Sequence, residues 1–102
     1  MNIQYKFDNN TILHYVSNRE WTYDDNDKEV TLVYELSFSF YDCHYIITIK
    51  KKDIENDNEF FLNEGDSKLF DSFEDFVYDN WETIIEKCRD FDYWLDELNK
   101  ED

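Results

Sequence analysis

Residues 29–50, EVTLVYELSFSFYDCHYIITIK, alternate apolar and polar side chains on either side of the pair Tyr41-Asp42. A period of two is typical of β-strands with one buried and one wet face. Aspartate tolerates the left-handed backbone of a tight turn, so this pair is the expected turn. We therefore predict an antiparallel hairpin over residues 29–50, with Val33 as the exception among the polar positions of its first strand. The apolar positions are Val30, Leu32, Tyr34, Leu36, Phe38 and Phe40, then Cys43, Tyr45, Ile47 and Ile49.

The remaining strands are expected on both sides of this hairpin. Residues 2–7 alternate in the same way, which predicts a short first strand. In residues 13–23 four apolar side chains share one parity, namely Leu13, Tyr15, Trp21 and Tyr23, and Ser17 and Arg19 interrupt the series. A short stretch around Phe60 to Leu62 is a candidate edge strand. Residues 1–62 are thus predicted to be mainly β, with about four strands.

The apolar period changes to three or four over residues 70–99, which predicts an amphipathic helical segment. One long helix and two shorter helices with a break near residues 89–92 both fit the pattern. Asp71 and Glu74 have the spacing of a capping box at its start. The expected fold is therefore α+β, a single domain over residues 1–102 with helix packed on one sheet face. The stripe consists of Phe70, Phe73, Val77, Trp81, Ile84, Cys88, Phe91, Leu95 and Leu98, and Trp94 borders it as a further core residue.

The charge distribution restricts the class of partner. The 102 residues carry a net charge of −16, with 41% hydrophobic and 20% aromatic residues, which favours a folded chain over a disordered one. Residues 1–52 carry eight acids and six bases, whereas residues 53–102 carry eighteen acids and four bases. A net negative charge of this size repels nucleic acid and anionic membranes, which disfavours both as direct partners. It favours a basic protein as the partner.

Location and redox state follow from what the sequence lacks. No apolar run approaches the ~20 residues of a membrane span, and Met1 to Phe7 has no apolar leader segment. Cys43 and Cys88, the two cysteines, are therefore expected as reduced thiols of a cytoplasmic protein.

The helical segment carries its acids on one side, at a spacing of three or four residues up to Asp90. Glu82 and Glu86 are a like-charge pair at i,i+4, which destabilises a helix by about 0.2–0.5 kcal/mol. Like-charge pairs of this kind recur along one face of the helical segment, against the usual preference for opposite charges at i,i+4. We therefore predict a functional surface there. Tyr78 and Tyr93 lie among the acids and are candidate aromatic anchors. The predicted partner-binding residues are Asp75, Asp79, Glu82, Glu86, Asp90 and Glu97, with Tyr78 and Tyr93.

A carboxylate on each turn gives a row of charges about 5.4 Å apart. Such a row, with a second one from the loops, could imitate two phosphate strands and occupy a groove that normally binds nucleic acid. The alternative is that the acids only keep an aromatic-rich protein soluble. The second row would consist of Asp24, Asp25 and Asp27 with Asp53, Glu55, Asp57 and Glu59.

Catalytic, metal and cofactor sites are not expected. Residues 53–64 have part of the spacing of a calcium-binding loop, but Asn58 replaces its glycine and the preceding segment is a strand. His14 and His44 lie within strand patterns and have no zinc-type spacing to the cysteines. No phosphate-binding loop or nucleophile motif is present, so we expect a protein that is not an enzyme.

In size, charge and α+β layout the whole chain resembles the small acidic phage-encoded inhibitors of bacterial defence nucleases. These are anti-CRISPR and anti-restriction proteins that mimic DNA. The resemblance rests on no diagnostic motif, so it assigns no residue a role. It implies a nucleic-acid-binding nuclease as the basic partner and the cytoplasm of the host bacterial cell as the location. A toxin-neutralising immunity protein or an acidic protein-interaction module has the same character, and the sequence leaves both open, as it leaves open the target and the oligomeric state.

The crowded carboxylates give a first prediction. Added sodium chloride should raise the melting temperature at neutral pH, because salt screens exposed like charges. Each kcal/mol of repulsion relieved should raise it by roughly 4 °C or more in a chain of this size. Thermal unfolding followed by circular dichroism at increasing salt measures the effect. A flat response would mean that the acids are dispersed over the molecule.

Overall fold

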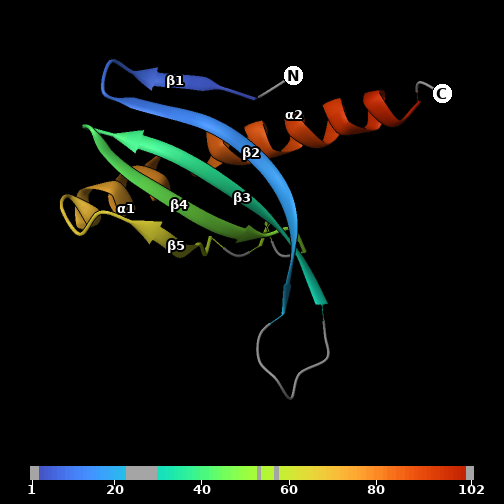
Figure 1. The fold of residues 1–102 in the computed structure, drawn as a ribbon, viewed down its shortest axis with the longest axis horizontal. Coiled ribbons are helices and arrows are strands. Elements are labelled where there is room, and N and C mark those ends of the chain that lie inside the picture. Colours follow the sequence, from blue (N-terminus) through green and yellow to red (C-terminus); the bar gives the residue numbers. More distant parts are fainter. Residues whose placement is uncertain (1–2, 23–29, 53, 57, 101–102) are drawn as a thin grey trace.

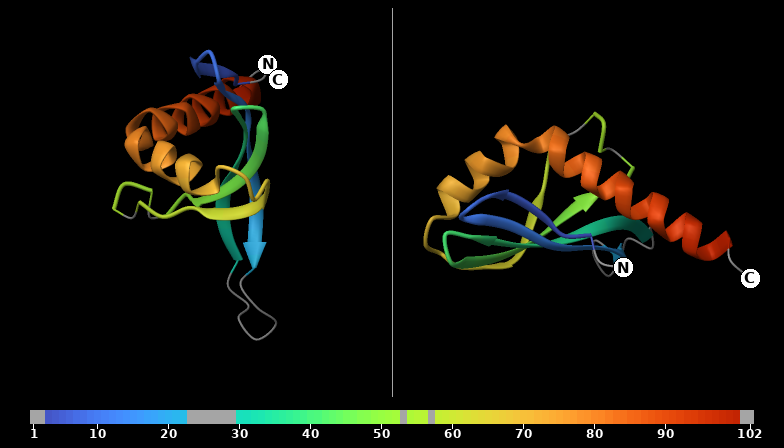
Figure 2. Two further views of the ribbon diagram at one scale, coloured as in Figure 1. Left: turned by 90° about the vertical axis from the view of Figure 1, so that its left-hand side faces the viewer. Right: turned by 90° about the horizontal axis from the view of Figure 1, so that it is seen from above.

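The computed structural model describes residues 3–22, 30–52, 54–56 and 58–100 (Figure 1). Within them, five strands form one antiparallel sheet in which each strand pairs with its neighbour in sequence. Both helices lie on one face of this sheet (Figure 2). The predicted α+β class is confirmed, with five strands instead of about four. The elements are β1 (Tyr5–Asp8), β2 (Thr11–Thr22), β3 (Val30–Phe40), β4 (Cys43–Lys50), β5 (Phe61–Gly65), α1 (Phe70–Asp79) and α2 (Trp81–Lys100).

The central hairpin is formed by β3 and β4, as predicted. Phe40 pairs with Cys43, so the turn has two residues, Tyr41 and Asp42. Both have positive φ, 48° and 66°, as a hairpin turn that matches the strand twist requires. The backbone N–H of Tyr41 donates to the carbonyl of Asn10 at 2.8 Å, which joins this turn to the β1–β2 turn.

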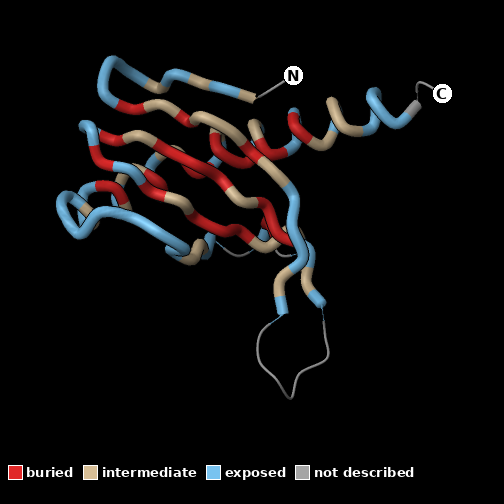
Figure 3. Tube along the Cα trace, in the orientation of Figure 1, coloured by how far each residue is buried: buried red, intermediate tan, exposed pale blue. Residues whose placement is uncertain are grey.

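The core lies between the helices and one face of the sheet (Figure 3). Its centre is aromatic, because Phe38 and Tyr45 from the sheet meet Phe73 from α1. The predicted stripe is buried or half-buried through Leu95, but Leu98 is 52% exposed. Figure 2 gives the reason, since the last turns of α2 extend past the strands.

The alternation predicted for β3 is wrong at its first end. Val30 and Leu32 are each 53% exposed, whereas Val33 is fully buried. The β2–β3 ribbon projects beyond the helices, which leaves the first two side chains uncovered (Figures 1 and 3). Val33 lies on the opposite face, where its cross-strand neighbours are the long side chains of Arg19 and Lys50.

The single parity predicted for residues 13–23 is also wrong. The β2–β3 register shifts between Leu13 and Tyr15, where β2 carries an irregularity of the bulge type. Leu13 and Val16 are therefore both buried in the core, and Tyr15 moves to the opposite face. Tyr23 lies outside the described residues.

The helical segment is divided at Asn80 and not near residues 89–92. Asn80 has φ −111° and ψ 21°, outside the helical range, and its side-chain amide donates to the carbonyl of Phe76 at 3.0 Å. The predicted capping box is wrong too, because the N-cap residue is Leu69 in the left-handed conformation, with no side-chain capping bond. Asp71 instead lies in the first turn of α1, where its negative charge interacts favourably with the positive end of the helix dipole.

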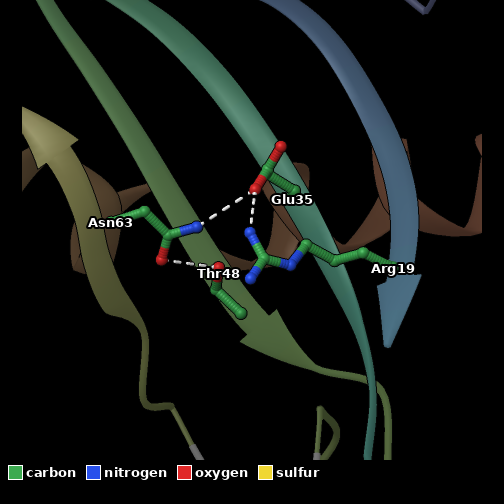
Figure 4. A network of polar contacts seen from close by, with 4 residues as sticks. All are labelled: Arg19, Glu35, Thr48 and Asn63. Atoms are coloured by element: carbon green, nitrogen blue, oxygen red, sulfur yellow. Dashed lines mark hydrogen bonds and ion pairs between the residues drawn. The ribbon is translucent and has the colours of Figure 1, made fainter. Parts of the chain in front are cut away.

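The sheet face away from the helices carries a polar network that links four strands (Figure 4). Arg19 donates to the Glu35 carboxylate at 2.6 Å. Asn63 donates to the same carboxylate oxygen at 3.1 Å and accepts a bond of 2.7 Å from the hydroxyl of Thr48. These bonds join β2, β3, β4 and β5 through side chains in addition to the backbone ladder.

Gly65 is the only glycine of the chain, and a close approach explains its position. A Cβ atom built there would lie 2.5 Å from the Tyr45 ring, which is fully buried. Gly65→Ala should therefore lower the free energy of unfolding by roughly 1–3 kcal/mol, the usual cost of overpacking. Urea unfolding followed by circular dichroism measures this, with Ser67→Ala at a nearby exposed position as the control. Equal stability of the two variants would contradict the close approach.

Candidate functional site

The eight predicted partner-binding residues are all exposed on the outer side of the two helices. The opposite sides of α1 and α2 are buried on the sheet, which fixes the orientation of the acids toward solvent. Tyr93 is 68% exposed and Tyr78 is 45% exposed. The acids and tyrosines therefore form one surface, which we call the acidic helix face. Its members are Asp75, Tyr78 and Asp79 on α1, with Glu82, Glu86, Asp90, Tyr93 and Glu97 on α2.

The break at Asn80 divides this face into two segments that run in different directions (Figure 2). At the junction the molecule has a cavity of about 820 Å³ between the helices and the connection that follows β4. We call it the junction groove. Four of the predicted residues line it, and Asp75, Asp90, Tyr93 and Glu97 do not. The lining residues are Ile54, Glu55, Asn58, Tyr78, Asp79, Asn80, Trp81, Glu82, Thr83, Ile85, Glu86 and Arg89.

Few of these acids are neutralised by the chain itself. Among the described residues, Asp75, Asp79, Glu82 and Glu86 form no ion pair. Asp90 lies 3.6 Å from the ammonium group of Lys87. The groove therefore holds three unpaired carboxylates, together with the pair described next.

Glu55 and Arg89 form an ion pair across the junction groove, between the connection after β4 and α2. Both side chains are more than half exposed, 71% for Glu55 and 57% for Arg89. An ion pair in that setting contributes about 0–1 kcal/mol. The pair therefore orients the Arg89 guanidinium but stabilises that position only weakly.

Aromatic rings form part of the groove wall. Tyr78 stacks on Trp81 with 6.2 Å between ring centroids, and the Phe60 ring centroid lies 5.4 Å from that of Tyr78. Trp81 is only 6% exposed, and its indole N–H has no acceptor among the described residues. Most buried donors in proteins have a partner, so this one is unusual.

The sequence pattern did not assign Trp81, Arg89 or Ile54 to a site. Trp81 belongs to the apolar stripe, which hides its second role as a wall of the groove. The spacing within residues 53–59 contains no information on where that segment meets the helices. Of the groove-lining residues in that segment, Glu55 alone was already a candidate, as part of the predicted second acidic row.

That second acidic row is described at two of its seven positions. Glu59 is exposed, and Glu55 pairs with Arg89. The others lie outside the described residues, so the row stays a prediction there: Asp24, Asp25, Asp27, Asp53 and Asp57.

The histidines and cysteines have local roles in the described structure. The imidazole of His14 shares a hydrogen bond of 2.6 Å with the Ser39 hydroxyl, and His44 is exposed. Cys43 and Cys88 are buried free thiols. The residues that the structure describes contain no group of three or more His, Cys, Asp or Glu side chains arranged to hold a metal ion.

Comparison of this chain with protein-family models, with curated protein sequences and with solved structures finds no match. In the described part of the chain, neither helix combines the length and the apolar character needed to cross a membrane.

One acid on α2 faces the sheet and holds the helix in place. The Tyr34 hydroxyl donates to the Asp92 carboxylate, and the Lys51 ammonium group lies 3.1 Å from its other oxygen. Lys51 also lies over the Tyr34 ring, 4.7 Å from the centroid. Burial, then the hydrogen bond to Asp92 and its charge, raise the pKa of Tyr34 well above its usual value. This cluster positions the helix that carries most of the acidic helix face.

The Tyr34 phenol predicts a loss of stability at alkaline pH. Because its folded-state pKa is raised, the stability it contributes is complete below about pH 10, the unfolded value, and is lost as pH rises through the folded value. Tyr34→Phe should cost about 1 kcal/mol at neutral pH and should also flatten the alkaline decline. Urea unfolding between about pH 7 and about pH 11.5 measures both effects. Tyr93→Phe, at an exposed position, is the control, and an equal decline in the two variants would contradict the assignment.

Proposed function

We propose that this protein is an acidic inhibitor that mimics nucleic acid and blocks the basic nucleic-acid-binding groove of a bacterial defence nuclease, a CRISPR effector or a restriction enzyme. The observation that carries the proposal is the acidic helix face. Four of its carboxylates, Asp75, Asp79, Glu82 and Glu86, are exposed and form no ion pair among the described residues.

Rigid placement of these charges supports mimicry. Helix residues three or four apart lie on the same side, so within each helix the carboxylates follow one another at intervals of about 5.4 Å. The Asp92 cluster holds α2 against the sheet, which limits the conformational entropy that binding would cost. A basic groove would thus meet fixed negative charges, as it does on a phosphate backbone.

The break at Asn80 adds curvature to the charged surface. Asp75 and Asp79 lie on one side of it, and Glu82 and Glu86 on the other. Since α1 and α2 run in different directions, the carboxylates bend around the junction groove instead of following one straight line (Figure 2). A nucleic-acid strand in a protein groove presents its phosphates along a curved path too.

A toxin-neutralising immunity protein or an acidic interaction module is the second candidate. Exposed tyrosines favour it, since Tyr93 and Tyr78 lie among the acids and aromatic side chains dominate many protein interfaces. In that case affinity would come from ring burial, and salt would have little influence. The two candidates thus differ in which side chains matter.

Charge reversal tests the proposal. Glu82→Lys combined with Glu86→Lys should slow association with the target nuclease by about tenfold or more, because steering depends on the local field. Association rates on an immobilised nuclease and inhibition of DNA cleavage measure this, with a panel of CRISPR effectors and restriction enzymes at low and high salt. The control is Glu20→Lys combined with Glu64→Lys, an equal charge change at exposed sheet positions.

The outcomes separate the two candidates. Inhibition that competes with DNA, weakens with salt and is lost in the helix variant alone supports mimicry. A larger loss in Tyr78→Ala or Tyr93→Ala, with little effect of salt, supports the immunity or adaptor function. Absence of inhibition across the panel at low salt contradicts the proposal.

A further inference from the structure

The second half of β2 has a neighbouring strand on one side only. β1 pairs with β2 from Thr11 to Leu13, whereas β3 pairs with it as far as Thr22. Within the described residues, no strand lies beside the stretch that begins at Asn18 on the side away from β3. The edge of a sheet presents backbone N–H and C=O groups to which an extended segment can add as a further strand. We call this stretch of β2 the open edge.

The register shows which backbone groups point outward at the open edge. The two-residue turn makes Phe40 bond to β4, and every second residue of β3 from there does the same. The alternate residues bond to β2, where Val33 pairs with Arg19. The N–H and C=O groups of Asn18 and Glu20, on either side of Arg19, therefore point away from β3. Both residues are exposed, so an added strand can reach them.

The last turns of α2 project on the side of the sheet where β1 lies. The Lys87 ammonium group is 4.4 Å from the centroid of the Tyr5 ring of β1, so this side of the helix faces β1. Trp94 lies about two turns further on the same side, since helix residues seven apart point in nearly the same direction. Trp94 is half-buried, and Leu98 is 52% exposed. Figures 1 and 2 show these turns extending past the strands.

The end of α2 and the open edge lie at the same level of the sheet. The Asp92 carboxylate accepts a hydrogen bond from Tyr34, which is the cross-strand partner of Asn18. The residues of α2 that follow Asp92 are therefore level with the part of β2 that lacks an outer neighbour. A strand added there would continue the line of β1 and pass beside Trp94 and Leu98. Its apolar side chains would cover surface that the present sheet leaves exposed.

Charge complementarity indicates what kind of strand fits. Glu20 on the open edge and Asp96 on the last turns of α2 are exposed, and neither forms an ion pair within the described part of the chain. A second copy of the chain would bring a further net charge of −16 to this place, including its own Glu20. Repulsion therefore disfavours a second copy, and a segment with lysine or arginine is favoured.

We infer that the open edge binds an extended, basic segment of a partner protein by strand addition. The segment would lie antiparallel to β2, as β1 and β3 do, with its backbone bonded to Asn18 and Glu20. Apolar side chains at alternate positions would cover Trp94 and Leu98, and basic side chains would face Glu20 and Asp96. The open edge is separate from the outer side of the helices, so this inference does not rest on the proposed function.

The test uses the full chain labelled with ¹⁵N and the peptide acetyl-Lys-Thr-Val-Thr-Val-Thr-Lys-amide. In an extended strand the valines and lysines of this peptide share one face. The peptide should shift the backbone amide resonances of Asn18 and Glu20 and the indole resonance of Trp94 in a saturable way. It should also slow hydrogen exchange at those two amides, because they gain acceptors.

Two N-methylated forms of the peptide are matched controls with the same charge and the same side chains. Directly opposed residues of an antiparallel pair share a face, so valines on the helix side direct their amides toward Asn18 and Glu20. Methylation of both valine amides should weaken binding about tenfold or more, whereas methylation of the first two threonine amides should change it less than about twofold. Equal affinity of the two forms, or unshifted amides at Asn18 and Glu20, would overturn the inference.

Variants of the chain test the two parts of the site separately. Asn18→Pro removes an outward N–H and keeps the bonds between β2 and β3, so peptide binding should fall about tenfold in a folded chain. Leu98→Ser should weaken binding about threefold through lost apolar contact. Leu62→Ser, at a 42% exposed position on β5, is the matched control and should have no effect. Circular dichroism checks the fold, and the N-methylated peptides decide the question if Asn18→Pro unfolds. Unchanged binding in Asn18→Pro, or equal binding in the two serine variants, would contradict strand addition.

Self-association is the competing outcome. In sedimentation velocity the chain alone should behave as a monomer. A dimer that Asn18→Pro dissociates would assign the open edge to a second copy and overturn the inference.

Discussion

Tyr45 is the residue around which the acidic part of the chain is folded. Its ring lies on that of Phe73, with centroids 4.2 Å apart and planes 6° from parallel. Its hydroxyl donates to the carbonyl of Lys68 just before α1, and Gly65 fits against the same ring. The path from β5 into α1 is therefore fixed by contacts to one buried side chain. The α1 part of the acidic helix face takes its orientation from that path, whereas α2 is held by the Asp92 cluster.

The free energies of burial and of charge repulsion explain how the fold tolerates so many acidic residues. Full burial of one large apolar side chain contributes about 1.5–3 kcal/mol, whereas each like-charge pair at i,i+4 on an exposed helix costs about 0.2–0.5 kcal/mol. The described core contains many such side chains, including Phe38, Tyr45 and Phe73. Asp92 follows a different rule, because it faces the sheet and is held by Tyr34 and Lys51. The acids of the acidic helix face avoid a desolvation cost because they are exposed to water.

The apolar repeats in the sequence predicted those features of the fold that depend on one regular repeat along the chain. The hairpin over residues 29–50 and the apolar stripe were readable because each has a regular repeat, and the acidic helix face follows as the opposite side of that stripe. Errors arose where elements meet. The exposure of Val30 and Leu32 depends on how far the helices reach, and the break at Asn80 depends on a side-chain bond to Phe76. The junction groove needs the position of Glu55 against Arg89, which no repeat encodes.

The order of the strands has a consequence for how the molecule is assembled. Since every strand pairs with the one before it, the sheet can grow by one hairpin at a time, and short loops close quickly. During synthesis the sheet segments emerge before α1 and α2. The apolar face of the sheet therefore stays uncovered until these two helices have been made. The helices that carry the acids are thus also the last layer to arrive, and they shield that face from contact with other chains.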